Sequence, residues 1–196
     1  KRNRLALAGS QESRALRRVG GKVINIAKLL SSSDNSNLVI KSKEDFREAC
    51  IHELKYSRYY DIPDIPETYI YESVLIEFRW LPHLEYLIRN MITKLPSWKH
   101  TIVCGNMNFE NITKVCEEIN KNINVIKLDI ENLDPSSYSD LLMTVDFWNL
   151  LTGEKILIYQ EDSFIFHGDI SKFLVYDYVG APWTTEHDDN DYHVGN

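Results

Sequence analysis

The sequence contains no apolar run that approaches the roughly 20 residues needed to cross a bilayer. Residues 1–10 also lack the apolar stretch of a secretory signal peptide. We therefore expect neither a transmembrane segment nor a secretion signal.

Cysteine is scarce in this chain. Only Cys50, Cys104 and Cys116 occur, far apart and odd in number, so they form neither a disulfide framework nor a zinc-ligand pattern. Cys104 lies in an apolar run and Cys116 on a helical face, which predicts buried thiols rather than nucleophiles. These features favour the cytoplasm or another reducing compartment.

The glycine-rich motifs that hold phosphate groups are also missing. The first strong strand pattern is not followed by Gly-x-Gly-x-x-Gly, and Gly-x-x-x-x-Gly-Lys-Ser/Thr does not occur. A dinucleotide-binding fingerprint and a P-loop are therefore excluded. If the protein binds phosphate, a metal ion and arginine have to hold it.

Charge is divided unequally along the 196 residues. Residues 1–28 contain eight Lys or Arg and one acid, which leaves 14 basic and 28 acidic residues for 29–196. An acidic body argues against a broad nucleic-acid-binding face. The basic arm could contact nucleic acid, anionic lipid, a protein partner or its own acidic body.

From about residue 67 onward, apolar runs alternate with helical periodicity. A helix is also predicted to start at Ser42, with Asp45 three residues on forming a partial capping box. Short segments with helical spacing separate the strands, which predicts right-handed βαβ crossovers and an α/β fold, a Rossmann-like, mostly parallel sheet flanked by helices. The expected strands are 71–78, 101–104, 124–128, 156–159 and a continuation at 164–166, and the expected helices are 82–95, 112–119, 135–151 (closed by Gly153) and 170–174. We divide the chain into 1–66, with the basic arm, linker and helix, and a domain at 67–196.

Polar residues follow the predicted strands where each strand ends. In an open α/β sheet these ends lie along one edge, where ligands usually bind. The central candidate at this edge is the stretch 153–163. It contains an apolar strand that is predicted to be buried on both faces, and Gln160, Glu161 and Asp162 follow this strand directly. Two carboxylates there could hold a divalent cation, but the spacing alone favours a turn and helix-cap pair at Asp162-Ser163, because carboxylates after strands are common. The other candidates at this edge are Glu77, Arg79, Gly105, Asn106 and Asp129.

Several segments, in order and spacing, resemble a family of uncharacterised, glycosyltransferase-like domains over about residues 70–196. The segments that carry the resemblance are 74–79 with 84–90, 146–148 with 153–163, and 176–183 with 194–196. The resemblance implies a GT-A-type fold, whose sheet binds a nucleotide sugar. The family pattern continues past Asn196, so we expect this domain to be truncated at its carboxyl end.

The resemblance also implies roles for the strand-end residues. An Asp-x-Asp motif in such transferases binds a divalent metal and the diphosphate, and Gln160-Glu161-Asp162 matches it with Gln160 in place of the first Asp. We therefore expect Asp162 and Glu161 to hold Mn²⁺ or Mg²⁺. Glu77 and Arg79 match the nucleotide-contacting position, and Gly105 and Asn106 lie on the same predicted edge.

Two functions follow as expectations. The first is transfer of a sugar from a nucleotide-diphosphate sugar to an unknown acceptor, with Asp169, Asp177 or the polar loop 187–193 as undistinguished candidates for the general base. The alternative is a non-catalytic binding or structural protein on the same scaffold, anchored through residues 1–28 to nucleic acid or a protein partner.

Overall fold

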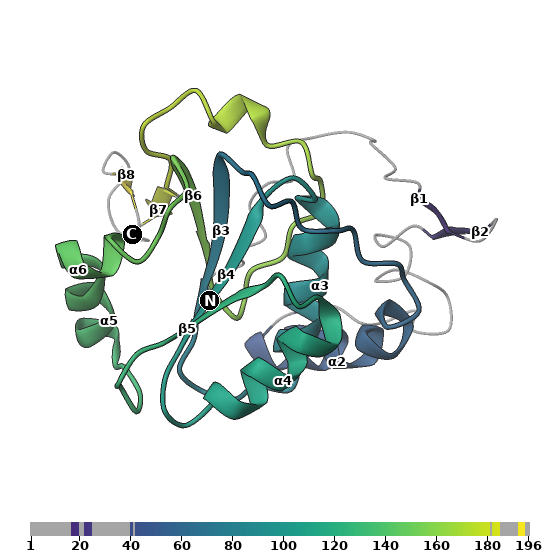
Figure 1. Ribbon diagram of the computed structural model, residues 1–196, viewed down its shortest axis with the longest axis horizontal. Coiled ribbons are helices and arrows are strands. Elements are labelled where there is room, and N and C mark those ends of the chain that lie inside the picture. Colours follow the sequence, from purple (N-terminus) through teal and green to yellow (C-terminus); the bar gives the residue numbers. More distant parts are fainter. Residues whose placement is uncertain are drawn as a thin grey trace.

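A four-stranded parallel sheet forms the centre of the molecule (Figure 1). The computed structural model describes residues 17–19, 22–24, 40, 42–180, 182–184 and 192–194, with side chains at 40 and 42–180. The strands are β3 (Tyr71–Ile76), β4 (Lys99–Cys104), β5 (Asn124–Lys127) and β6 (Lys155–Tyr159), in the order β5-β4-β3-β6. The predicted α/β class with a parallel sheet is confirmed.

Strand β3 lies inside the sheet, between β4 and β6. Val74 faces Thr101 of β4 on one side and Ile158 of β6 on the other. Val74 and Leu75 are fully buried, as expected for a strand that is covered on both faces. The same expectation is wrong for most of β6, which is half-buried up to Tyr159 because β3 is its only partner in the described sheet.

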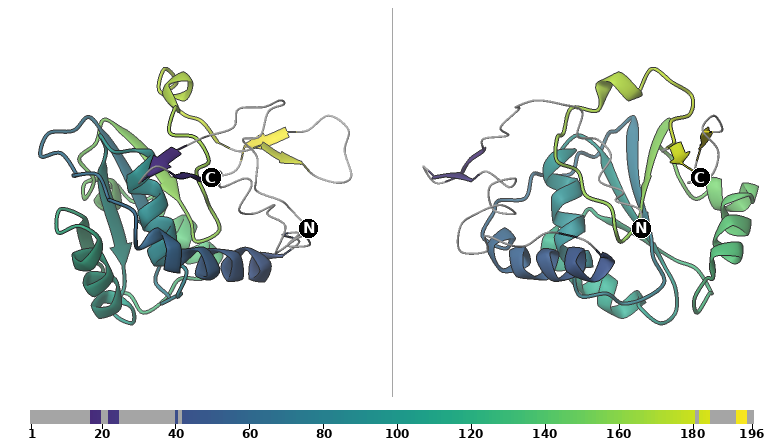
Figure 2. Two further views of the ribbon diagram at one scale, coloured as in Figure 1. Left: turned by 90° about the vertical axis from the view of Figure 1, so that its right-hand side faces the viewer. Right: turned by 180° about the vertical axis from the view of Figure 1, so that it is seen from behind.

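Helices cover both faces of this sheet, as the view from the side and the view from behind show (Figure 2). One face packs against α2 (Lys43–Ser57), α3 (Leu84–Lys94) and α4 (Phe109–Ile119), and the other against α5 (Pro135–Leu142) and α6 (Val145–Trp148). Helix α3 buries the apolar stripe that its helical spacing predicts, and each such side chain stabilises the fold by about 1.5–3 kcal/mol. That stripe consists of Leu84, Leu87, Ile88, Met91 and Ile92.

Helix α2 belongs to the same core as α3. The predicted capping box is confirmed, because the Asp45 N–H donates to Ser42 Oγ at 3.1 Å and the Ser42 N–H donates to Asp45 Oδ2 at 3.0 Å. Phe46 and Cys50 are buried in the apolar cluster that also contains α3. Although α2 precedes the predicted boundary at 66/67, it packs against the residues that follow this boundary.

The predicted helix over 135–151 is wrong in its length, because it breaks after Leu142. Thr144 starts the separate helix α6, and its Oγ1 accepts a hydrogen bond from the Phe147 N–H at 3.3 Å. Gly153 is therefore not a helix C-cap. Its N–H donates to Glu72 Oε2 at 2.8 Å, and an added Cβ would lie 2.6 Å from the Glu72 Cβ, so this glycine permits close approach to β3.

The predicted continuation strand at 164–166 is also wrong. The Asn90 side chain takes the place of a neighbouring strand, because its Oδ1 accepts from the Ile165 N–H at 3.0 Å and its Nδ2 donates to the Ile165 carbonyl at 3.1 Å. Lys94 Nζ donates to the Phe166 carbonyl at 2.7 Å. Beyond this segment, the predicted helix at 170–174 is a short 3-10 helix, η1 (Ser171–Phe173).

Two small antiparallel strand pairs lie outside the sheet. Strands β1 (Arg17–Val19) and β2 (Lys22–Ile24) pair within the basic arm, and β7 (Pro182–Thr184) pairs with β8 (Tyr192–Val194). Most of the predicted arm and of the polar loop 187–193 lies outside the described residues. Among the described helices, none combines the length and the apolar character that spanning a membrane requires.

The three cysteines are buried and unpaired, which confirms the burial predicted for Cys104 and Cys116 and adds that of Cys50. Burial raises the pKa of Cys50 and of Cys116 to about 12, and that of Cys104 to about 11. Such thiols stay protonated near neutral pH and are poor nucleophiles.

His100 gives the fold a pH-dependent stability. Its Nε2 donates to the Leu95 carbonyl at 3.1 Å and its Nδ1 accepts from the Ser73 hydroxyl at 2.7 Å, which fixes the neutral ring. Burial lowers the pKa of His100 to about 4. An unfolded histidine titrates near 6.5, so between these values the unfolded chain binds a proton that the folded chain does not.

We therefore expect stability to fall as the pH falls from 6.5 toward 4, by up to about 3 kcal/mol from this residue. Urea unfolding at pH 7, 6 and 5 measures the slope in the part of the window where carboxylates titrate least. His100→Gln should flatten that slope whatever its stability at pH 7. Equal slopes for the two proteins would contradict the assignment.

Candidate functional site

The strand order places a topological switch point between β3 and β6. The chain passes from β3 to β4 and β5 in one direction, and β6 then returns to the opposite side of β3. In open parallel sheets, ligands bind outside the carboxyl ends of the strands at such a point. Glu77 and Arg79 follow β3, and Gln160 to Asp162 follow β6, so five of the predicted site residues lie at this position.

Glu77 and Arg79 form a bidentate ion pair just after the end of β3. The Arg79 Nε donates to Glu77 Oε1 at 2.8 Å and its Nη2 donates to Oε2 at 2.7 Å, while the Arg79 N–H also reaches Oε1 at 2.9 Å. The hydrogen bond to Glu77 is the largest cause of the raised pKa of Arg79. Glu77 is buried and the Arg79 side chain is 50% exposed. Glu77 thus positions Arg79, which is open to a ligand.

The buried carboxylate of Glu161 is bound by several partners. Arg47 donates to both of its oxygens, at 3.0 and 2.8 Å, and Lys43 Nζ lies 3.4 Å from Oε1. His83 Nε2 lies 3.2 Å from Oε2 and 2.8 Å from the Glu161 carbonyl, so this nitrogen carries the hydrogen. Burial alone would raise the pKa of Glu161, but His83, Arg47 and Lys43 outweigh burial and hold it well below its usual range.

Asp162 shares Lys43 with Glu161. Lys43 Nζ lies 3.1 Å from Asp162 Oδ2, and the Lys43 side chain is 59% exposed. Arg79 joins the same group, because its Nη2 lies 3.9 Å from Glu161 Oε1. We call these residues the switch-point cluster: Lys43, Arg47, Glu77, Arg79, His83, Glu161 and Asp162. Within the cluster three cations balance three carboxylates, and the carboxylates are the more deeply buried. Outside it, the exposed Glu44 carboxylate lies 3.4 Å from Arg47 Nη1.

Gln160 lies beside the cluster in a turn. The Ser163 N–H donates to the Gln160 carbonyl at 3.0 Å, and the Gln160 N–H donates to Ser163 Oγ at 3.2 Å. The Gln160 side chain hydrogen-bonds Tyr138 of α5. The turn and the charged site therefore coexist, because Gln160 and Ser163 close the turn while the Asp162 carboxylate binds Lys43.

Gly105 and Asn106 lie one strand away from the switch point. A Cβ on Gly105 would collide with the Ile130 carbonyl oxygen, and Asn106 Nδ2 donates to Asp129 Oδ1 at 2.8 Å and to Glu131 Oε1 at 3.2 Å. These contacts tie the end of β4 to the end of β5. The structure does not bring Gly105 or Asn106 into the cluster.

Four contributing residues were not predicted. Asn108 is fully buried, and its Nδ2 donates to the carbonyls of Glu77 and Arg79 at 2.8 and 3.1 Å, which fixes the cluster's β3 segment. Lys43 and Arg47, spaced four residues apart on α2, and His83, just before α3, are the others. The four-residue spacing indicates one helix face, but nothing in the sequence pairs that face with Glu161.

Two base candidates lie away from the cluster. Asp177 is 3.7 Å from Lys155, the first residue of β6, and so lies at the amino end of the sheet. Asp169 accepts from the Ser171 N–H and hydroxyl at 3.1 and 2.6 Å. Its neighbour Gly168 packs against the Lys94 carbonyl at the end of α3, also toward the amino end of the strands. The side chains of loop 187–193 lie outside the described residues.

The donor set at Glu161 and Asp162 does not fit a divalent cation as it is arranged. Mn²⁺ and Mg²⁺ need several oxygen ligands, whereas the oxygens here are bound to Arg47, Lys43 and His83. Within the part of the chain that the structure describes, no group of three or more His, Cys, Asp or Glu side chains is arranged to hold a metal ion.

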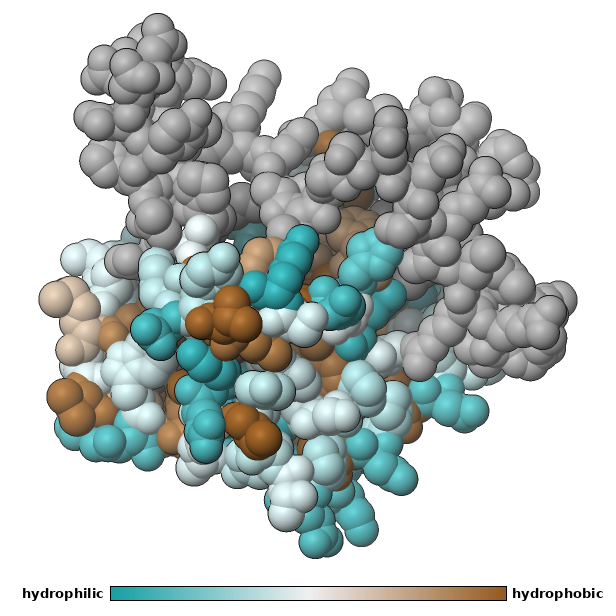
Figure 3. Space-filling model, turned by 90° about the horizontal axis from the view of Figure 1, so that it is seen from above, coloured by the Kyte–Doolittle hydropathy of each residue, from teal (hydrophilic) through white to brown (hydrophobic). Residues whose placement is uncertain are grey.

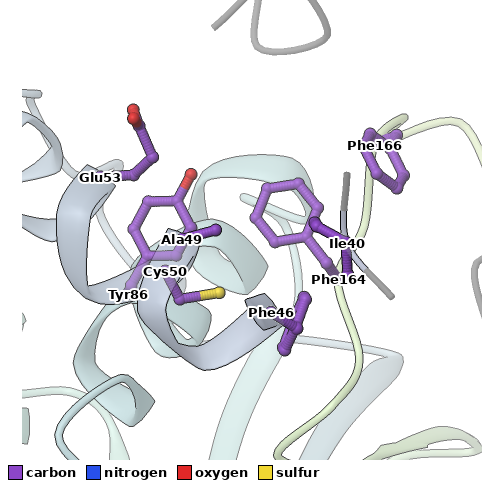
Figure 4. Close-up of a pocket in the computed structure, with 8 residues that line it drawn as sticks. All are labelled: Ile40, Phe46, Ala49, Cys50, Glu53, Tyr86, Phe164 and Phe166. Carbon is purple, nitrogen blue, oxygen red and sulfur yellow. The ribbon is translucent and has the colours of Figure 1, made fainter. Parts of the chain in front are cut away.

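Two hollows occur near the cluster without including it. Figure 4 shows an apolar pocket of about 40 Å³ between α2, α3 and the segment after β6, too small for a nucleotide. The other, of about 360 Å³, lies between α2, α4 and the loop after β3, and Trp80 lines it. On the face shown in Figure 3, apolar side chains form separate spots among polar ones. Because neither hollow includes the charged residues that follow β3 and β6, we place the candidate site at the switch-point cluster.

Residues 122–196 match a family described as a protein of unknown function, DUF5672. The match includes β6 and the segment from Gln160 to Asp162, whereas α2, β3 and β4 lie outside it. No curated protein and no solved structure matches the chain. The match assigns no activity, so function has to be argued from the cluster.

Proposed function

We propose that the protein binds a nucleotide-diphosphate sugar at the switch-point cluster and transfers the sugar to an acceptor. One observation carries the proposal: two exposed cations, Arg79 and Lys43, are held by buried carboxylates at the switch point of a parallel sheet. Arginine and lysine at such a position suit phosphate oxygens, and arginine can bind two of them at once. The resemblance over 70–196 supports the same substrate class.

In the proposed reaction, the bond between the anomeric carbon and the diphosphate breaks, and the nucleoside diphosphate leaves with the electron pair. An acceptor hydroxyl oxygen forms the new bond to this carbon, and its proton passes to a base at the acceptor. Arg79 stabilises the charge that develops on the leaving phosphate. The hollow beside Trp80, the residue after Arg79, offers the acceptor room next to the cluster.

Calorimetry with UDP, GDP and UMP, with and without Mn²⁺, tests the proposal. We expect a diphosphate to bind more tightly than UMP, and Arg79→Gln to weaken diphosphate binding about tenfold or more, since a hydrogen bond to a charged group is lost. Lys55→Gln is the control, because Lys55 lies over the Tyr56 ring in the last turn of α2, outside both the cluster and the hollow beside Trp80. Absence of binding by the folded protein under every condition would refute the proposal.

A non-catalytic binding role is the alternative, and the ion pairing of Glu161 and Asp162 favours it because cations of the protein itself already occupy both carboxylates. In that case residues 1–28 would supply the contact with nucleic acid or a protein partner. Release of free nucleotide from UDP- or GDP-sugars over time would support the transferase. Tight binding with no release in the presence of varied acceptors would favour the alternative.

A further inference from the structure

The Lys43 ammonium lies where the sequence predicts a metal ion. Its Nζ is 3.1 Å from Asp162 Oδ2 and 3.4 Å from Glu161 Oε1, so a single positive charge bridges the two predicted metal ligands. A lysine ammonium has three hydrogens to donate. Two of them face the carboxylates, and the exposure of the side chain leaves the third for a ligand.

The surroundings of Glu161 favour this arrangement over a divalent cation. Arg47 occupies both oxygens of Glu161, and His83 donates to the same carboxylate. A divalent ion at the two acids would have to displace Lys43 and would lie close to two guanidinium groups, Arg47 and Arg79. Like charges at such distances repel one another strongly in a partly buried site.

Lys43 is also held in place before any ligand arrives. It lies in the first turn of α2, whose start is fixed by the capping box at Ser42 and whose apolar side is anchored in the core by Phe46. Because both anchors are independent of the cluster, the ammonium is pre-organised beside Arg79. Pre-organised charge is the most effective kind for stabilising a phosphate as it leaves.

We infer that Lys43 takes the role of the metal, so that Lys43 and Arg79 hold the diphosphate group of the nucleotide without a divalent cation. This inference rests on the proposed function, because it concerns the phosphates of the same substrate. It assigns to α2, which precedes the region of family resemblance, a direct part in ligand binding.

Calorimetry with UDP and GDP, first in EDTA and then in Mn²⁺, separates the possibilities. We expect the wild-type affinity to be the same within about twofold in both, and Lys43→Gln to lose about tenfold or more in EDTA. Lys43→Arg should retain most of the affinity because it keeps the charge. Lys55→Gln, in the last turn of the same helix and lying over the Tyr56 ring, should bind as the wild type does.

Binding that requires Mn²⁺ in the wild type, or Lys43→Gln that binds normally in EDTA, would overturn the inference and leave the proposed function standing. Absence of nucleotide binding in EDTA and in Mn²⁺ would instead refute both. Cooperative thermal unfolding of each variant establishes that it is folded, which is expected because the Lys43 side chain is largely exposed.

Discussion

Replacing Glu72 by alanine is expected to lower the free energy of unfolding by about 3–5 kcal/mol, the usual cost of breaking a buried ion pair. Glu72 is fully buried in β3. Its carboxylate accepts from the Thr101 hydroxyl, from the N–H groups of Thr152 and Gly153 at 2.7 and 2.8 Å, and pairs with Lys99 at 3.2 Å. The substitution removes this acceptor from all four donors, of which Lys99 keeps Thr152 Oγ1 at 2.8 Å, and it breaks the contact between β3 and the turn that leads into β6.

Urea unfolding followed by tryptophan fluorescence measures this loss. Glu154→Ala, an exposed glutamate in the same turn, is the matched control and should change stability by no more than about 0.5 kcal/mol.

Burial would raise the pKa of Glu72, but Thr101, the two backbone N–H groups and Lys99 outweigh burial and lower it. Its contribution is therefore present above the unfolded pKa of about 4.3 and is lost as the pH falls below it. A loss under about 1 kcal/mol at pH 7 would contradict this role.

Glu161→Gln should cost about 3 kcal/mol or more and loosen α2. This single substitution does not isolate the ion pair, because it also leaves Arg47 partly buried without its carboxylate. A double-mutant cycle of Glu161→Gln with Arg47→Gln isolates the pair, and we expect a coupling of about 1–3 kcal/mol because the two side chains share two hydrogen bonds.

The pH dependence of Glu161 has the same sign as that of Glu72. Its lowered folded pKa means that the stabilisation is complete above about 4.3 and disappears as the pH falls through the lower folded value. Hydrogen exchange of the α2 amides should rise in Glu161→Gln, since this carboxylate ties the first turns of α2 to the end of β6. Additive effects in the cycle and unchanged exchange would show that the pair does not hold α2.

The order of strands and helices could be predicted because the side chains that become buried are apolar and recur in the sequence at the spacing of a strand or a helix. β3 ends in the apolar residues 74–76, and α3 repeats apolar residues at helical spacing. The errors occur where a polar side chain decides the outcome. Thr144 ends one helix and starts another, and Asn90 satisfies the backbone at 165 so that no strand forms there. Neither effect changes the apolar pattern.

The site was predicted in part for a similar reason. Residues that follow β3 and β6 meet because parallel strands end at one edge, so Arg79 and Asp162 could be expected together. The contact of Lys43 with Glu161 joins residues 118 positions apart. A charged side chain on a helix surface has the same local pattern whether it faces water or a distant carboxylate, so α2 could not be assigned to the site beforehand.

The packing of α2 has a practical consequence for anyone trimming this polypeptide. A fragment cut to residues 70–196 would uncover the apolar flank of α3 and remove the guanidinium and ammonium that neutralise Glu161. Such a fragment would expose hydrophobic surface and leave the negative charge of Glu161 uncompensated. The shortest piece that keeps this packing intact begins no later than Ile40, which packs against the same apolar cluster.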